Sequence, residues 1–111
     1  MGEGYETLEV EGELDIATAP RMIAALNDAL ANMVSPLVVD LSRVVFMDST
    51  GLALLMNARR RVMRRGHGFA IVCPGGGPIS RVFEIADMVE SLHVCPDRAS
   101  ARRAATQAAR A

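Results

Sequence analysis

One short stretch, FMDSTGL at residues 46–52, places an acid and two hydroxyls ahead of a long apolar and arginine-rich segment. Asp48, Ser49 and Thr50 are all good N-cap residues for a helix, and Gly51 is tolerated in a first helical turn. A hydroxyl there is exposed, and a phosphate added to it meets free backbone N–H groups and the positive end of the helix dipole. The stretch is therefore either a helix start alone or a helix start whose serine accepts a phosphoryl group.

Catalytic interpretations of the same stretch are weak. Aspartic proteases use Asp-Thr-Gly or Asp-Ser-Gly, whereas an extra residue separates Asp48 from Gly51 here. A serine nucleophile elbow has the pattern GxSxG, and MDSTG lacks its first glycine. A receiver-type aspartate that accepts phosphate needs a lysine later in the chain, and the sequence contains none. We therefore expect no catalytic residue and no enzymatic activity.

Other residues that could bind a ligand or take part in chemistry have simpler structural explanations. PGGGP at 74–78 lacks both GxxxxGK[ST] and GxGxxG, so turn formation explains it better than anion binding. Arg59 falls in an apolar stripe, where its stem can pack while its head reaches solvent or an acid. The neighbouring arginines form either a solvated face or a contact for a partner's acidic patch. Cys73 and Cys95 lack CxxC spacing, so we expect buried thiols rather than a disulfide, with no metal and no cofactor.

Composition limits the partners and the compartment. The chain of 111 residues has a formal net charge of −1, which argues against attraction to nucleic acid or to an anionic membrane. The longest apolar runs, such as Leu52–Met56, are far shorter than the ~20 residues that span a bilayer. The acidic N-terminal segment has no signal-peptide pattern. We expect one cytoplasmic domain, with a core over 7–96 and a C-terminal helix over 97–111.

Periodicity predicts how the first half of the chain folds. Apolar residues alternate with glutamates over residues 8–14, which is typical of a strand with one charged side, and that charge would protect a sheet edge. Thr18 can cap a helix over 19–33 that has a proline in its first turn. PLVVDL at 36–41 indicates a central strand that is covered on both faces.

The second half continues the alternation of helices and strands. The predicted elements are a helix from FMDST to about Arg65, a strand at 69–73, a helix over 79–86, a strand at 91–95 and a helix from about Asp97. Such alternation with short connections implies an α/β fold in which at least part of the sheet is parallel.

Two motifs together resemble the STAS domains of the anti-sigma factor antagonists. GELDIATAP at 12–20 is followed by VVDLSRVVFMDSTGL at 38–52. The later segment FAIVCPGGGPISRVFEIADMVESLHV at 69–94 is similar to the last strand, helix and strand of that family. The resemblance covers roughly residues 8–110. It implies a single α/β STAS-like domain, with a small mixed sheet of four to five strands and about four helices packed mainly on one side.

The resemblance also implies a function and a site. In phosphorylated members the serine directly after the aspartate of this motif is modified, which is Ser49 here. The unmodified protein binds an anti-sigma factor that is itself an ATP-dependent serine kinase, and so liberates a sigma factor. Phosphorylation by that kinase ends the binding, and a metal-dependent phosphatase restores it. Asp15 and Asp48 match acidic positions flanking the docking surface, and Thr50 and Gly51 complete the loop.

Two departures leave alternatives open. Family members carry a further strand before the one that ends in GELD, and few residues precede Leu8 here. This sheet edge is therefore exposed or covered by another chain, which allows a weak homodimer. STAS domains also serve as unphosphorylated scaffolds in lipid-transport complexes and sensory assemblies, and GLALLM at 51–56 fits those branches too. The serine after Asp48 favours the antagonist over the scaffold.

Overall fold

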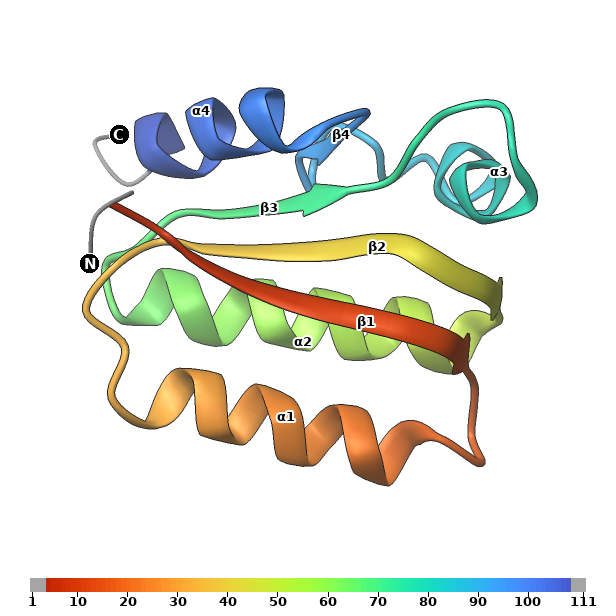
Figure 1. Cartoon of the computed structure of the whole chain (residues 1–111), viewed down its shortest axis with the longest axis horizontal. Coiled ribbons are helices and arrows are strands. Elements are labelled where there is room, and N and C mark those ends of the chain that lie inside the picture. The colour runs from red at the N-terminus through yellow and green to blue at the C-terminus, as the bar shows by residue number, and fades with distance from the viewer. Residues whose placement is uncertain (1–3, 109–111) are drawn as a thin grey trace.

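Strands and helices alternate along the chain in the computed structural model, which describes residues 4–108 (Figure 1). The strands are β1 (Glu6–Leu14), β2 (Leu37–Met47), β3 (Phe69–Val72) and β4 (Val94–Cys95). The helices are α1 (Ala19–Ala31), α2 (Ser49–Arg64), α3 (Pro78–Ile85) and α4 (Arg98–Ala108). The predicted α/β class and its numbers of strands and helices are confirmed.

The four strands form one sheet in the order β1-β2-β3-β4, so β1 lies at an edge and β2 is central, as predicted. Each of the three strand pairs is parallel, and the expectation of a mixed sheet is therefore wrong for the described residues. The physical reason is the connectivity. Antiparallel neighbours can be joined by a tight hairpin, whereas each pair of consecutive described strands is joined by a helix that crosses back before the next strand begins.

Alternating residues of the central strands build two separate cores. Leu37, Val39 and Ile71 point to the face that α1 and α2 cover, and they join a large cluster of buried aliphatic side chains. Val38, Ala70 and Val72 point to the other face, where they pack against Ala101 and Ala105 of α4. The sheet is thus buried on both sides along its middle strands, as its continuous apolar runs predict.

The helices do not all lie on one side of the sheet. Figure 1 shows α1 and α2 below the strands, α4 above them, and α3 near the end at which β2 and β3 finish. The expected packing of helices mainly on one side has one exception, α4, because α1, α2 and α3 all contribute side chains to the large core on the other face. Ala101 and Ala105 recur at helical spacing on α4, and this small-residue stripe lets the helix approach the sheet closely.

Some boundaries differ from those predicted. β2 runs to Met47 rather than ending at residue 41, because β1 continues to pair with it through two irregularities in register. β4 contains only Val94 and Cys95, since the residues before it form turns and His93 has a positive φ of 51°. The predicted C-terminal helix is present as α4, and residues 109–111 lie outside the described part of the chain.

Candidate functional site

The sheet register brings the two predicted acidic positions to the same edge of the molecule. Leu14 and Met47 are the last paired residues of β1 and β2, so Asp15 and Asp48 directly follow neighbouring parallel strand ends. A backbone hydrogen bond from Asp48 N to Leu14 O, 3.2 Å long, joins the two loops. Carboxyl ends of adjacent parallel strands are where α/β folds place their binding residues.

Asp48 is the N-cap of α2. Its backbone is extended, with φ −116° and ψ −166°, and its carboxylate accepts a hydrogen bond of 2.9 Å from the backbone N–H of Thr50. Ser49 is therefore the first residue of the helix and not its cap. The Ser49 side chain is exposed and makes no hydrogen bond with other described residues. The Asp48 carboxylate thus caps a free N–H group of the first helical turn, and the Ser49 hydroxyl remains available for a reaction.

Gly51 is required by close packing. A Cβ at this position would lie 2.7 Å from Met47 Cγ and 2.9 Å from both Cβ and O of Leu14. These separations are below normal van der Waals contact, so the first turn of α2 rests directly on the ends of β1 and β2. The glycine therefore fixes the height at which Ser49 stands above the sheet edge.

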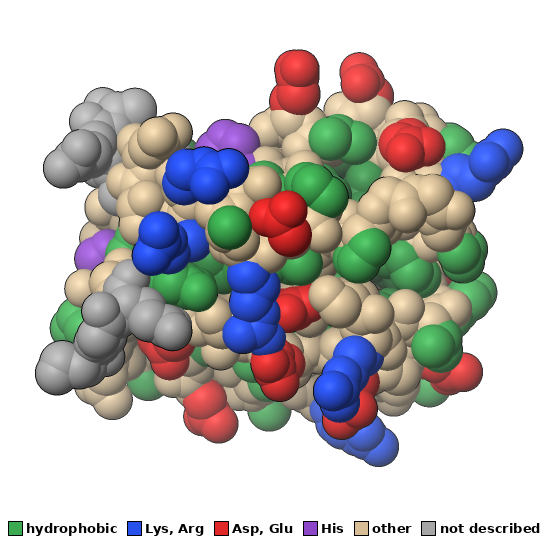
Figure 2. Space-filling view, turned by 45° about the horizontal axis from the view of Figure 1, so that its top comes forward, with side chains coloured by type: hydrophobic (Ala, Val, Ile, Leu, Met, Phe, Trp, Pro, Cys, Tyr) green, Lys and Arg blue, Asp and Glu red, His purple; other side chains and the backbone are tan. Residues whose placement is uncertain are grey.

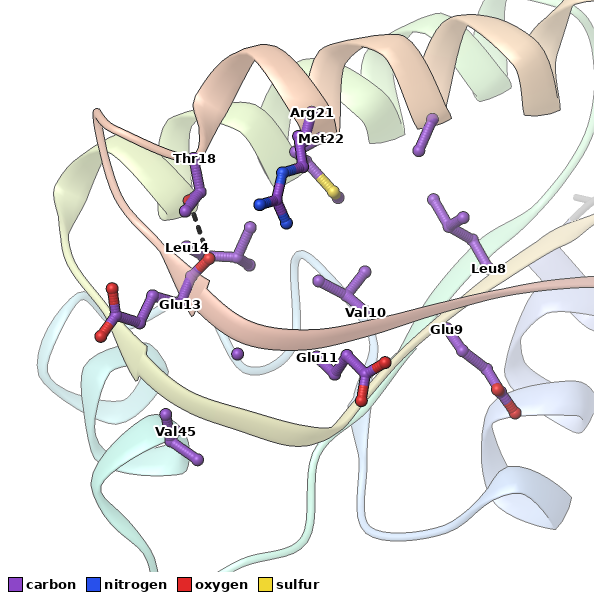
Figure 3. Close-up of a pocket in the computed structure, with 12 residues that line it drawn as sticks. Leu8, Glu9, Val10, Glu11, Glu13, Leu14, Thr18, Arg21, Met22 and Val45 are labelled. Atoms are coloured by element: carbon purple, nitrogen blue, oxygen red, sulfur yellow. Dashed lines mark hydrogen bonds between the residues drawn. The ribbon is translucent and has the colours of Figure 1, made fainter.

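Thr18 orders the loop that carries Asp15. Thr18 Oγ1 accepts a hydrogen bond of 3.0 Å from Asp15 N, and Thr18 N donates one of 3.0 Å to Asp15 Oδ1. The same hydroxyl donates to the carbonyl of Glu13 at 2.7 Å, as the dashed line in Figure 3 shows. Thr18 precedes α1 as predicted, but its side chain bonds back to the loop instead of capping the helix. Its effect is to hold Asp15 in place.

Exposed apolar side chains accompany the acids at this edge. Ile16 is 78% exposed, directly after Asp15, and Phe46 is 48% exposed, on the strand that leads to Asp48. Val45 is also 69% exposed. The face that carries α4 shows hydrophobic and acidic side chains side by side (Figure 2). Large exposed hydrophobic residues that lie together are typical of a protein–protein contact. The sequence prediction did not place Val45 and Phe46 on a strand, because it ended that strand at residue 41.

A groove lies beside this edge, between β1 and α1 (Figure 3). Leu8, Val10, Leu14 and Met22 supply its apolar walls, and its volume is about 470 Å³. Arg21 stands over it from α1.

Residues 4–108 contain no cluster of candidate metal ligands, and none of the helices described there has the length and hydrophobicity of a membrane span.

An ionic cluster, in which Asp40 is buried while Arg98 and Glu9 are exposed, ties α4 to the sheet, and the sequence prediction also missed it. Asp40 on β2 is 8% exposed and accepts hydrogen bonds from Ser42 N at 2.9 Å and Arg98 Nε at 2.8 Å. Arg98 also pairs with Glu9 on β1. Burial by itself raises the pKa of Asp40, but the hydrogen bonds from Ser42 and Arg98 outweigh it and lower that pKa below its ordinary range. Glu9 and Asp40 are paired across β1 and β2, so their two negative charges lie side by side, and Arg98 neutralises them.

The two cysteines lie close in the backbone but face opposite sides of the sheet. Cys73 N donates to Cys95 O at 2.8 Å, yet Cys73 belongs to the core under α1 and α2, while Cys95 packs against the core under α4. Both thiols are free. Burial raises the pKa of each, with Glu84 adding to the effect at Cys73 and Asp97 at Cys95. This arrangement supports free thiols over a disulfide; Cys73 is buried as expected, whereas Cys95 is only partly buried.

The arginine within the apolar stripe is only partly accounted for. Arg59 lies beside Met88, Ser91 and Leu92 at the edge of a small hollow, and its Nε is buried without a hydrogen-bond partner among the described residues. Its stem packs as predicted, but no acid among those residues pairs with it.

Comparisons with known proteins agree with the fold and the motifs. A family model described as the STAS domain matches residues 3–101. An anti-sigma-B factor antagonist from Staphylococcus aureus is 31% identical over 90 residues, which are 81% of this chain and 82% of the relative. The crystal structure of an anti-sigma factor antagonist from Mycobacterium paratuberculosis is similar with a TM-score of 0.81 and 28% identity, covering 95% of this chain and 88% of that one.

A second solved structure has the same fold in a protein with a different description. The crystal structure of a sulfate transporter family protein from Wolinella succinogenes is similar with a TM-score of 0.68 and 20% identity. The similarity covers 90% of this chain and 83% of that chain. The fold is therefore shared by proteins of more than one kind.

Proposed function

Because the chain belongs to the STAS-domain family, we propose that it is an anti-sigma factor antagonist that phosphorylation of Ser49 switches off. Unmodified, it binds a kinase-type anti-sigma factor in the cytoplasm and frees a sigma factor. The observation that carries this proposal is the exposed, unbonded Ser49 hydroxyl at the start of α2. Asp15 and Asp48 lie at the same edge and form the docking surface with Ser49, Thr50 and Gly51.

The modification itself is a phosphoryl transfer catalysed by the partner. A bond forms between Ser49 Oγ and the γ-phosphorus of ATP, while the bond from that phosphorus to the oxygen bridging it to the β-phosphate breaks and ADP leaves. The hydroxyl proton passes to a base of the kinase. A phosphatase then cleaves the new bond with water, which releases inorganic phosphate and restores the hydroxyl. The chain contributes only the acceptor and its placement, in keeping with the expectation that it is not an enzyme.

The helix start can hold a phosphate without unfolding. Asp48 satisfies the N–H of Thr50, and the other N–H groups of the first turn have no side-chain cap. These groups and the helix dipole favour an anion at this position. The fold therefore needs no rearrangement to accommodate the modified serine.

The same phosphate should end binding by repulsion and desolvation. It adds about −1.5 to −2 charges, directly beside Asp48. Asp48 cannot turn away without losing its bond to Thr50 N. A like-charge contact across an interface costs several kcal/mol, and about 1.4 kcal/mol is a tenfold change in affinity. Local charge is therefore sufficient for the switch, without a large conformational change.

Labelling with kinase and ATP tests the modification. Each kinase-type anti-sigma factor of the source genome is purified and incubated with the protein and ATP, and the phosphosite is mapped by mass spectrometry. We expect a single phosphate on Ser49, none on Ser49→Ala, and full labelling of the control Ser91→Ala, since Ser91 is an exposed serine outside this edge. Absence of label from Ser49, or unchanged labelling of Ser49→Ala, would contradict the proposal.

A constitutive scaffold subunit is the second candidate, since a transporter family protein shares the fold. Such a scaffold would not respond to charge at Ser49. A pulldown that recovers transporter or sensor subunits equally with wild type and Ser49→Asp would favour this alternative. Recovery of an anti-sigma factor by the wild type alone would favour the antagonist.

A further inference from the structure

The exposed surface of α2 is one continuous stripe that begins at Ser49. Its other members are Ala53, Asn57, Arg60 and Arg64, and all five side chains are exposed. Spacings of three and four residues place them on the same face of the helix. The buried residues of α2 lie on the opposite face: Gly51, Leu55, Ala58 and Val62. A partner that contacts Ser49 from solvent therefore also faces the two arginines.

These two arginines are not used within the described part of the chain. The ion pairs found there belong to Arg98, and neither Arg60 nor Arg64 forms one. Arg65 differs, because its guanidinium donates to the carbonyl of Leu30 and ties the end of α2 to α1. The helix dipole favours cations in the last turn, where Arg64 lies, but Arg60 precedes that turn. The positive charges of Arg60 and Arg64 are therefore not neutralised by ion pairs within the described part of the chain.

The distance from Ser49 suits a single interface. At about 1.5 Å per residue, Arg60 lies roughly 16 Å and Arg64 roughly 22 Å along the helix from Ser49. A standard protein–protein interface covers about 800 Å² on each partner, which is wide enough to include both Ser49 and Arg60. The acidic N-cap Asp48 lies just before the stripe, and the basic residues lie toward its other end.

We propose that Arg60 and Arg64 form a docking site for an acidic surface of the anti-sigma kinase, and that this contact orients α2 so that Ser49 enters the kinase active site. The inference rests on the proposed function. Two exposed arginines are complementary in charge to an acidic surface. We favour an acidic protein surface over nucleic acid, because the chain as a whole has a net charge of −1 and lacks the cationic excess that nucleic-acid binding needs. The arginines are positioning residues, because they do not touch the phosphoryl group that is transferred.

The test is steady-state phosphorylation of Ser49 by the anti-sigma kinases of the source genome, with the double variant Arg60→Glu/Arg64→Glu. The matched control is Arg102→Glu/Arg103→Glu, which makes the same change in net charge on exposed residues of α4, across the sheet. Thermal unfolding followed by circular dichroism checks that both variants fold. We expect KM to rise about tenfold for the α2 variant with kcat nearly unchanged, and no change for the α4 variant. The difference should shrink as salt is raised.

The outcomes separate this inference from the proposed function. If the wild type is labelled on Ser49 but KM is the same for both variants, the docking site is wrong and the phosphoswitch stands. If the α4 variant raises KM as much, the effect is one of net charge and the docking site is again wrong. If the wild type is not labelled, the proposed function fails and the docking site with it. Binding of duplex DNA that is lost only in the α2 variant would assign the stripe to nucleic acid instead.

Discussion

Replacing Gly51 with alanine should push the first turn of α2 off the sheet edge. The new Cβ would stand 2.7 Å from Met47 Cγ and 2.9 Å from Leu14 O. The methionine side chain is flexible and can move, but the carbonyl of Leu14 is backbone and accepts the hydrogen bond from Asp48 N. The clash therefore falls on the contact that holds Asp48 and Ser49 in place.

The expected cost combines two opposing effects. Overpacking a well-packed site costs about 1–3 kcal/mol, whereas alanine recovers up to about 1 kcal/mol of helix propensity relative to glycine. We therefore expect a net loss of about 1–2 kcal/mol in the free energy of unfolding. For a domain of this size, that corresponds to a fall in Tm of roughly 5–15 °C.

Urea unfolding and thermal unfolding, both followed by circular dichroism, measure this change. Ala53→Gly is the matched control, because Ala53 is an exposed position of the same helix and reports the propensity difference alone. Gly51→Ala should lose stability and also weaken binding of the anti-sigma factor, since Ser49 moves. A Gly51→Ala protein as stable as the wild type, or more stable, would refute the close-packing argument.

Three further predictions concern the helix cap, the ionic cluster and the thiols. Asp48→Ala removes the N-cap of α2 and should lower the free energy of unfolding by about 1 kcal/mol, measured by urea unfolding. Arg98→Gln should destabilise the protein by roughly 1 kcal/mol at neutral pH. Because the pKa of Asp40 is lower in the folded protein than in the unfolded chain, its contribution is present above the unfolded pKa and is lost as pH falls through the folded pKa. A difference between variant and wild type that persists unchanged at lower pH would contradict this. Cys73 and Cys95 should both titrate as free thiols in urea and react much more slowly in the native protein, because burial raises the pKa of each; fast native labelling would contradict it.

Local signals in the sequence were sufficient to predict most of the elements. The period-2 pattern before Leu14, the cap residues before α2 and the glycines after Arg65 act within a few residues of the structure that they determine, and those elements are present. The position of Ser49 at a helix start follows from the same local signals. Which of the three polar residues caps the helix does not, since Asp48, Ser49 and Thr50 all have the necessary oxygen.

Features set by tertiary contacts could not be predicted. The side of the sheet that α4 covers depends on Ala101 and Ala105 meeting Val38 and Ala70, and no local pattern encodes that choice. The last part of β2 carries exposed Val45 and Phe46, so its pattern does not resemble a strand buried on both faces. The pairing of Asp40 with Arg98 joins residues far apart in the chain, and only the folded arrangement brings them together.

The central claim is that charge on Ser49 controls binding. The most direct measurement compares the Kd of the anti-sigma factor for the unmodified protein and for protein phosphorylated stoichiometrically on Ser49, by isothermal titration calorimetry in the absence of ATP hydrolysis. Several kcal/mol of like-charge repulsion predict that phosphorylation weakens binding by about a hundredfold or more. Equal Kd values for the two forms would contradict the account.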